Sequence, residues 1–369
     1  MKKTNNKINC ILYREPKKVF SKYWFIDKGF LYSYDPLAME TKKEYVFSSL
    51  NKYPYLYVEY VNGYLFMSPY EENRIAIYDF ENRKMEYIDC QYEQEKPMCG
   101  RMFVYKSKIF MLSVIIENGI KIVENLRDVR TVCISDWYED SKREGISTLN
   151  AVKDNYMWIP SHNSNKILKL DMDSEEYQLI TIDDDDTGYS AIQIEEKYIW
   201  LTESRTGSLV CYDMVTKEVQ KFSVPEGFDY VCKTKDYVHQ DMFDFGDKII
   251  TIPSFANKMT IFDKQTQEYK LLDIEFLDSF DNRYKTNLYL TCCFGKKIDE
   301  NFLWVQRTKD GLIANIDIRD FSYKTFAFEI NQEEVTERFM MCLLSDKESI
   351  ITESEDAPLA TFIRCVGRS

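Results

Sequence analysis

The chain has 369 residues, of which 44% are hydrophobic, and its formal net charge is −13. Lysines and arginines are interspersed with acidic residues, so nucleic acid and anionic membranes, which bind clustered basic residues, are not expected as partners. The ten cysteines show neither a disulfide framework nor a zinc-ligand spacing, and no apolar run has the length of a signal-peptide core or a membrane span. We therefore expect a cytoplasmic protein with reduced thiols and no metal site.

Short strands separated by polar turns are predicted along the whole chain. Four candidates open it, at Ile8–Arg14, Lys22–Asp27, Gly29–Asp35 and Lys43–Ser49. Tyr55–Cys90 then contains four strand patterns in succession: YLYVEY, YLFMSP, RIAIYD and MEYIDC. Five further copies of this pattern follow, at Phe103–Ile134, Leu149–Ile182, Ala191–Val224, Met242–Ile274 and Leu290–Ile330.

The clearest copy of the repeat is Ile199–Val224, IWLTESRTGSLVCYDMVTKEVQKFSV, which predicts strand, loop, strand, turn and strand. The third strand of a copy ends in an Asp, whose side chain can bond backbone N–H groups two residues on and so favours a turn. This position is filled by Asp35, Asp79, Asn125, Asp171, Asp213, Asp263 and Asp317. The mean interval is about 47 residues, and a period of about 40–50 residues with four strands per copy is typical of a β-propeller.

We therefore predict an all-β fold, a single β-propeller domain over residues 1–369 with four-stranded antiparallel blades. Seven third-strand copies are counted, and Met340–Arg364 resembles an eighth that lacks its fourth strand. Because an unpaired seam would leave open backbone groups, we expect the N-terminal Ile8–Arg14 to supply that strand and close the ring from both termini. The prediction is eight blades; the alternative is seven, if the terminal strands merge into one blade.

The connections between the predicted strands are uneven. Loops from third to fourth strands are short, whereas several loops from a fourth strand to the next first strand are long. The long ones are Ser135–Ser147, Pro225–Val238, Glu275–Asn287 and Asn331–Arg338. In a propeller these loops share one face with the loops between second and third strands. We call it the long-loop face, and we expect binding groups there.

Both histidines are expected toward the long-loop face. His239 precedes a first strand, and first strands line the channel of a propeller, so His239 and Asp241 are candidate acid and base residues, with Glu203 as a further candidate. The structural alternative is that His162 lies in a surface loop and that His239 is a strand-end residue with satisfied hydrogen bonds.

Further polar residues are expected in the loops after second strands or at the starts of first strands. In an enzyme, Arg101 or Arg205 would hold an anion. The candidate ligand contacts are His162, Arg101, Asn150, Tyr189, Arg205, Gln240 and Arg307. Each of them is equally explained as part of a solvated turn. The acidic loop Asp183–Asp186 has contiguous rather than alternating carboxylates, a spacing that does not favour calcium.

The unit Ile199–Val224 and the recurring Asn-Lys-apolar turn, as in Asn165-Lys166-Ile167, resemble repeats of the streptogramin lyase, NHL and kelch-like propellers. The resemblance covers nearly the whole chain and implies the propeller fold. In streptogramin lyases a His and acidic residues over the channel act with a divalent metal. No matching motif can be placed on the two histidines here, so the activity does not follow from the resemblance.

Two classes of function remain, and the cofactor is left open. The first is a non-catalytic recognition module, expected to be a monomer, that binds a protein, peptide or glycan on the long-loop face. Its expected anchors are the aromatic loop residues Trp137, Tyr138, Phe228, Tyr230, Phe280 and Tyr284. The alternative is a lyase or hydrolase with an acid/base site over the channel. We favour binding, because catalysis usually needs a denser set of titratable groups.

Overall fold

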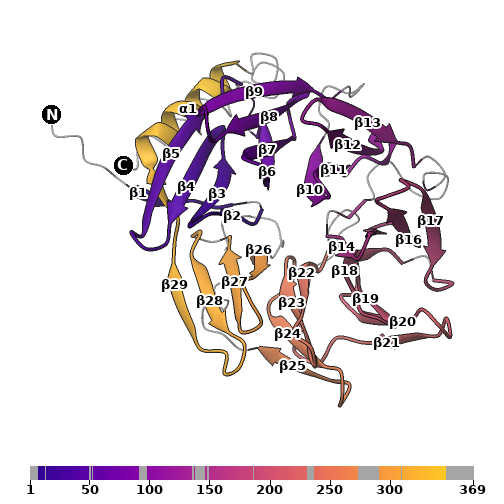
Figure 1. Ribbon diagram of the computed structural model, residues 1–369. Helices are drawn as coiled ribbons and strands as arrows, with labels where there is room; N and C mark the ends of the chain where they lie inside the picture. Colours follow the sequence, from indigo (N-terminus) through magenta and orange to yellow (C-terminus); the bar gives the residue numbers. More distant parts are fainter. Residues whose placement is uncertain are drawn as a thin grey trace, which may run out of the picture.

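The computed structural model describes residues 7–12, 14–49, 51, 53–90, 98–134, 137, 146–147, 149–185, 187–230, 237–272, 291–308 and 310–345. They form seven four-stranded antiparallel sheets arranged in a ring, together with a two-stranded pair and one α-helix (Figure 1). The sheets are the blades of a β-propeller. The predicted all-β architecture of four-stranded blades is therefore confirmed.

Each blade is a meander whose first strand lies toward the centre of the ring and whose fourth strand lies at its outer edge (Figure 1). The blades, in chain order, are β2 (Lys17–Val19), β3 (Lys22–Asp27), β4 (Phe30–Asp35), β5 (Glu40–Val46); β6 (Tyr55–Val61), β7 (Tyr64–Pro69), β8 (Arg74–Asp79), β9 (Lys84–Asp89); β10 (Cys99–Tyr105), β11 (Lys108–Ser113), β12 (Ile120–Glu124), β13 (Asp128–Val132); β14 (Ala151–Lys153), β15 (Tyr156–Ser161), β16 (Ser164–Asp171), β17 (Tyr177–Thr181); β18 (Tyr189–Ile194), β19 (Tyr198–Glu203), β20 (Leu209–Asp213), β21 (Val219–Phe222); β22 (His239–Asp244), β23 (Lys248–Pro253), β24 (Met259–Asp263), β25 (Glu268–Leu272); and β26 (Cys292–Lys297), β27 (Phe302–Arg307), β28 (Ile313–Asp317), β29 (Tyr323–Phe326). A 3₁₀ turn, η1 (Ile116–Asn118), precedes β12.

The burial of the strands follows from their place in the blade. The middle strands pack against neighbouring blades on both faces, and they are continuously apolar, as in β19, where five of six residues are buried. The fourth strand has one solvated face, and β21 accordingly has no buried residue. This contrast is why the second and third strands carried the strongest sequence signal.

The recurring Asp at the end of the third strand forms the predicted turn. Asp213 accepts hydrogen bonds from the N–H groups of Val215 at 2.8 Å and Thr216 at 3.1 Å. Equivalent bonds occur at Asp35, Asp79, Asp171, Asp263 and, from Arg319 N–H, Asp317. Asn125 fills the position in the third blade with a left-handed φ of 50°, a conformation that Asn tolerates.

The prediction of eight blades is wrong, and the alternative of seven is confirmed. The first blade is complete, because Lys17–Val19 provides its first strand. The region predicted as an eighth blade begins inside a helix, α1 (Gln332–Ser345), and its residues 346–364 lie outside the described residues. Asn331–Arg338, predicted as a long loop, is instead the end of β30 (Glu329–Asn331) and the first part of α1.

The start of α1 has a local cause. The Asn331 side chain accepts hydrogen bonds from the N–H groups of Glu333 at 2.9 Å and Glu334 at 3.3 Å, which caps the helix. Two glutamates in the first turn add a favourable interaction with the helix dipole. The Asn followed by Glu-Glu was a helix-start signal that the strand periodicity obscured.

The ring is closed outside the blades. The N-terminal strand β1 (Lys7–Asn9) pairs antiparallel with β30, so Ile8–Arg14 does not complete the last blade as predicted. The main chain then continues along the last blade, where the buried Gln306 accepts from Leu12 N–H at 2.8 Å and donates to the Cys10 carbonyl at 2.9 Å. We refer to residues 7–12 together with β30 as the clasp.

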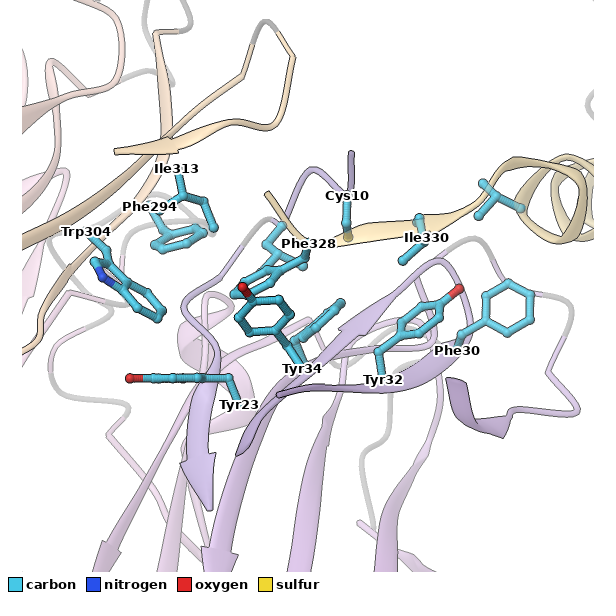
Figure 2. Packing of buried hydrophobic residues seen from close by; sticks show 13 residues of the cluster. Cys10, Tyr23, Phe30, Tyr32, Tyr34, Phe294, Trp304, Ile313, Phe328 and Ile330 are labelled. Atoms are coloured by element: carbon cyan, nitrogen blue, oxygen red, sulfur yellow. The ribbon is translucent and has the colours of Figure 1, made fainter. Parts of the chain in front are cut away.

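Aromatic packing fills the junction between the last and first blades. Phe328 is fully buried, stacks on Phe25 with ring centres 4.9 Å apart, and meets the edge of Tyr34 at 4.6 Å. Figure 2 shows Cys10 and Ile330 of the clasp on one side of Phe328 and Tyr34, with Trp304 of the last blade and Tyr23 of the first blade on the other. The clasp thus contributes apolar area as well as hydrogen bonds.

No helix of the described residues is long and apolar enough to cross a membrane.

Candidate ligand site at the channel mouth

Strand register places equivalent residues of the seven first strands at the same depth in the channel. One set pairs with the third residue of each second strand: Lys17, Glu59, Phe103, Ala151, Gln193, Phe243 and Lys296. We call it the inner ring. Side chains of a strand alternate with a period of two, so the residues two positions earlier point to the same side. They form the mouth ring: Glu15, Tyr57, Arg101, Leu149, Ala191, Asp241 and Phe294.

The mouth ring opens on the long-loop face, because the long loops lead directly into the first strands. In four blades the pairing shifts by one residue just before the mouth-ring position, between Cys99 and Arg101 in β10 and between His239 and Asp241 in β22, for example. The same shift occurs in β18 and β26, and in β6 the irregular pairing spans Tyr55 to Val58. Such bulges re-aim the next side chain, and they are common beside functional sites.

Two connected hollows follow these rings. The outer cavity has a volume of about 30 Å³. Its lining comprises Arg14, Glu15, Tyr57, Arg101, Leu149, Gln240, Asp241, Phe243, Phe294 and Gly295. A second cavity of about 70 Å³ is lined by residues of both rings, among them Lys17, Glu59 and Lys296. Spaces of this size hold a few water molecules or one small polar group, rather than a whole ligand.

The charged residues of the channel form linked pairs. Glu15 accepts from Lys296 at 2.8 Å and lies 3.5 Å from Arg101, and Lys17 lies 2.5 Å from Glu59. Burial alone would raise the pKa of Glu15, but the charges of Lys296 and Arg101 outweigh it and hold that pKa below its ordinary value. Glu15 is therefore ionised at neutral pH.

Asp241 has an altered acidity in the mouth ring. Burial raises its pKa to about 7, against the opposing effects of a 2.8 Å hydrogen bond from Gly295 N–H and of the Arg101 charge. The neighbouring Arg101 keeps 23% of its side chain exposed, so the mouth is not fully closed to water. With a pKa of about 7, Asp241 gains or loses its proton near neutral pH.

Arg14 lies at the same level as the mouth ring but comes from the segment that leads out of the clasp. Its guanidinium carbon is 5.4 Å from the centre of the Tyr57 ring. The Tyr237 hydroxyl is hydrogen-bonded to the side chains of Arg14 and Gln240. The Tyr237 ring in turn stacks on His162, with centres 4.9 Å apart and planes 5° from parallel. This stack extends the site from the channel to the loops around it.

The predicted site residues separate into those in the channel and those outside it. Arg101, Gln240 and Asp241 line the mouth cavity, and His162 lies beside it through Tyr237. His239 points elsewhere: its Nε2 lies 3.0 Å from the Gly207 carbonyl, and its ring packs on Phe228. Burial lowers the pKa of each histidine to about 4, so both are neutral at physiological pH.

Other candidates lie in the loops of single blades. Glu203 pairs with Lys221 at 3.1 Å and accepts a hydrogen bond from Thr206, while Tyr189 donates to Asp183 at 2.9 Å. The remaining candidates are Arg205, which is exposed, Arg307, which pairs with Asp310 at 2.6 Å, and Asn150, whose buried amide has no hydrogen-bond partner among the described residues. None of these side chains lines the mouth cavity.

The expected aromatic anchors need correction. Trp137 and Phe228 are only 1% and 6% exposed, because they pack into apolar clusters beneath the loops, so they are core residues rather than contact residues. Tyr230 is 38% exposed and remains a candidate. Tyr138, Phe280 and Tyr284 lie outside the described residues.

Sequence reasoning missed six channel residues: Arg14, Glu15, Lys17, Tyr57, Glu59 and Lys296. An alignment of the repeat on its second strands would have found several of them, because Lys17, Glu59 and Lys296 each pair with the third residue of that strand. Arg14 and Glu15 precede a first strand of only three residues, which carried too little periodicity to be aligned.

No protein-family model and no curated protein sequence matches this chain. Similar solved structures are YCF48 from Cyanidioschyzon merolae (TM-score 0.58, 11% identity, covering 86% of this chain and 97% of that one) and a chain of the Mitotic Checkpoint Complex (0.53, 8%, 87% and 90%). A catalytically inactive virginiamycin B lyase from Staphylococcus aureus, solved with Quinupristin, gives a TM-score of 0.49 at 14% identity, covering 73% of this chain and 83% of that one. The first two likenesses confirm the expected resemblance to propeller proteins at the level of the fold alone.

Proposed function

We propose that this protein is a non-catalytic recognition module that binds a protein, peptide or glycan on its long-loop face, with the mouth ring at the centre of the contact. The observation that carries the proposal is the set of charged side chains, Arg14, Arg101 and Asp241, around one small cavity at the end of the channel. Charges held partly out of water cost stability unless they are compensated, so their place at a cavity suggests use by a ligand.

The surroundings of the mouth support a binding role. The bulged starts of four first strands, β10, β18, β22 and β26, all lie at this end of the channel. Tyr230, in the loop before β22, offers an exposed aromatic ring on the same face. A ligand can therefore spread over the loops while one small group enters the mouth.

The chemistry of the mouth supports binding over the lyase or hydrolase alternative. Both histidines are neutral and held by other contacts, His239 at the Gly207 carbonyl and His162 on Tyr237. The outer cavity of about 30 Å³ is too small to enclose a scissile bond together with its two flanking groups. Recognition of one polar group needs neither a base nor a larger cavity.

The test is a thermal-shift screen of peptides and glycans, followed by affinity measurements on the hits. We expect a hit whose affinity falls at least tenfold in Arg101→Gln and clearly in Tyr230→Ala. Arg319→Gln, at the turn between β28 and β29 on the opposite face, should bind normally. A hit that binds all three variants equally would place recognition elsewhere, and chemical conversion of the hit, detected by mass spectrometry, would favour the enzyme.

A further inference from the structure

Positive charge is in excess around the channel. Among the described residues that line its two cavities, the cations are Arg14, Lys17, Arg101 and Lys296, and the anions are Glu15, Glu59 and Asp241. Four positive groups thus meet three acids even when Asp241 is ionised, although the whole chain carries −13. An acidic protein that keeps a locally cationic cavity concentrates field there and attracts an anionic group.

The acids of the channel are engaged by neighbouring groups. Glu15 lines the mouth cavity, where it is bound by Lys296 and lies 3.5 Å from Arg101, and Glu59 is bound by Lys17 at the level of the inner ring. Asp241 accepts from Gly295 N–H. Burial raises the pKa of Asp241, so this carboxyl carries less than a full negative charge at neutral pH. When Asp241 is protonated, the two arginines of the mouth cavity meet one ionised acid, Glu15, which Lys296 also neutralises.

The two arginines reach the mouth from different parts of the ring. Arg14 precedes β2 and lies over the Tyr57 ring, whereas Arg101 belongs to β10, in the blade after that of Tyr57. Both line the same cavity. Both guanidinium charges act on the pKa of Tyr57, against the larger effect of burial, which places both close to its hydroxyl. The Tyr237 hydroxyl, which is also hydrogen-bonded to the Gln240 side chain, holds Arg14.

We propose that the mouth cavity binds a carboxylate of the ligand, between the guanidinium groups of Arg14 and Arg101. This rests on the proposed function and names the group that is recognised. Guanidinium and carboxylate match in plane and in spacing, and charge-assisted bonds between them are about twice as strong as neutral ones. A carboxylate also has few enough atoms for a cavity of about 30 Å³.

The neighbouring groups select a monoanion. A dianionic phosphate would bring a second negative charge near Glu15 and Asp241, which like-charge repulsion disfavours. A carboxylate brings one charge, and the Asp241 carboxyl can donate its proton to one carboxylate oxygen while it is protonated. The Tyr57 hydroxyl is a further donor in the cavity lining.

The test compares probes that differ only in the carboxylate. A mixture of hexapeptides with free C-termini and the same mixture with amidated C-termini are each titrated into the protein. Succinate and inorganic phosphate serve as small probes. Thermal shifts and calorimetry are recorded for the wild type, Arg14→Gln, Arg101→Gln and the matched surface control Arg319→Gln. Circular dichroism establishes that each variant is folded. As a second probe of the site, Leu149→Glu adds a negative charge to the lining of the mouth cavity without replacing either arginine.

We expect free-acid probes to bind the wild type and Arg319→Gln, and to bind both arginine variants and Leu149→Glu at least tenfold more weakly. Shifts with free peptides alone would assign the carboxylate to a chain terminus, and shifts with succinate as well would extend it to small acids. Equal binding of amidated and free peptides would overturn this inference and leave the proposed function standing. Stronger binding of phosphate than of carboxylates, or no carboxylate binding to the wild type, would also overturn it.

Discussion

Gln306 of the last blade holds the main chain at Cys10, which precedes the first blade. Its Nε2 donates to the Cys10 carbonyl at 2.9 Å and to the Gly311 carbonyl at 2.9 Å, and its Oε1 accepts from Leu12 N–H at 2.8 Å. One fully buried amide therefore satisfies three backbone groups at the seam of the ring. The seam depends on this side chain as well as on the pairing of β1 with β30.

Substitution Gln306→Ala should lower the free energy of unfolding by about 3 kcal/mol, because it leaves buried backbone groups without partners. Urea unfolding followed by tyrosine and tryptophan fluorescence measures the change. Gln220→Ala, on the exposed fourth strand β21, is the matched control and should change stability by less than about 0.5 kcal/mol. Equal effects of the two substitutions would show that the clasp does not stabilise the ring.

Substitution Phe328→Ala should cost about 3–5 kcal/mol, because the ring is fully buried among Phe25, Tyr34 and Trp304 and its removal leaves a cavity at the seam. Phe20, which is 72% exposed, provides the same side-chain change at the surface. Thermal unfolding of Phe328→Ala and Phe20→Ala should differ by several degrees. A loss below about 1 kcal/mol for Phe328→Ala would contradict the packing described for the seam.

Asp241 should make the stability of the protein fall as the pH rises. Its pKa is about 7 in the folded chain and near 3.8 in the unfolded chain. The folded state therefore binds more protons than the unfolded state between these two pH values. The stabilisation is complete below about pH 4 and is lost as the pH rises through 7. Asp241→Asn keeps an acceptor for Gly295 N–H but cannot ionise. Its stability relative to the wild type should therefore increase by up to a few kcal/mol from pH 4 to pH 8, and a constant difference in urea titrations would refute this.

The histidines should show the opposite dependence. Burial lowers the pKa of His162 and of His239 from 6.5 to about 4, so the unfolded chain binds more protons in this window and stability is lost as the pH falls through it. The chain has two histidines, so their imidazole signals can be resolved by NMR. Neither signal should titrate between pH 8 and pH 5.5. A midpoint near 6.5 for either would return it to the list of candidate acids and bases.

The fold could be predicted because each repeat carries its own local signal. The buried second strand and the Asp that ends the third strand gave the blade pattern in six copies, and Asn125 replaces the Asp in the seventh. The prediction of eight blades was wrong because Met340–Arg364 was interpreted as strands, whereas its first residues belong to the helix α1. Periodicity in short apolar runs does not separate strand from helix. The closing strand was assigned to the correct region, but its partner is β30 rather than a blade.

The site could be predicted only in part. Arg101, Gln240 and Asp241 were found because first strands line the channel. Which side chain faces the channel is decided by bulges such as the one before Asp241, and a bulge shifts alternation by one residue without any sign in composition. Composition likewise does not reveal that Trp137 and Phe228 pack into apolar clusters and are buried there.

The clasp also determines when the site comes into existence. Arg14 and Glu15 follow directly on residues 10–12, which are bound by a glutamine 294 positions further along the chain from Leu12. Contacts of such sequence separation form late, since the intervening chain must first be ordered. A growing or truncated chain with six blades would thus contain folded strands and still lack Phe294 and the anchoring of Arg14 and Glu15 at the mouth. Ligand binding would then report the finished ring, and a ligand would in turn stabilise the closed ring against opening at its seam.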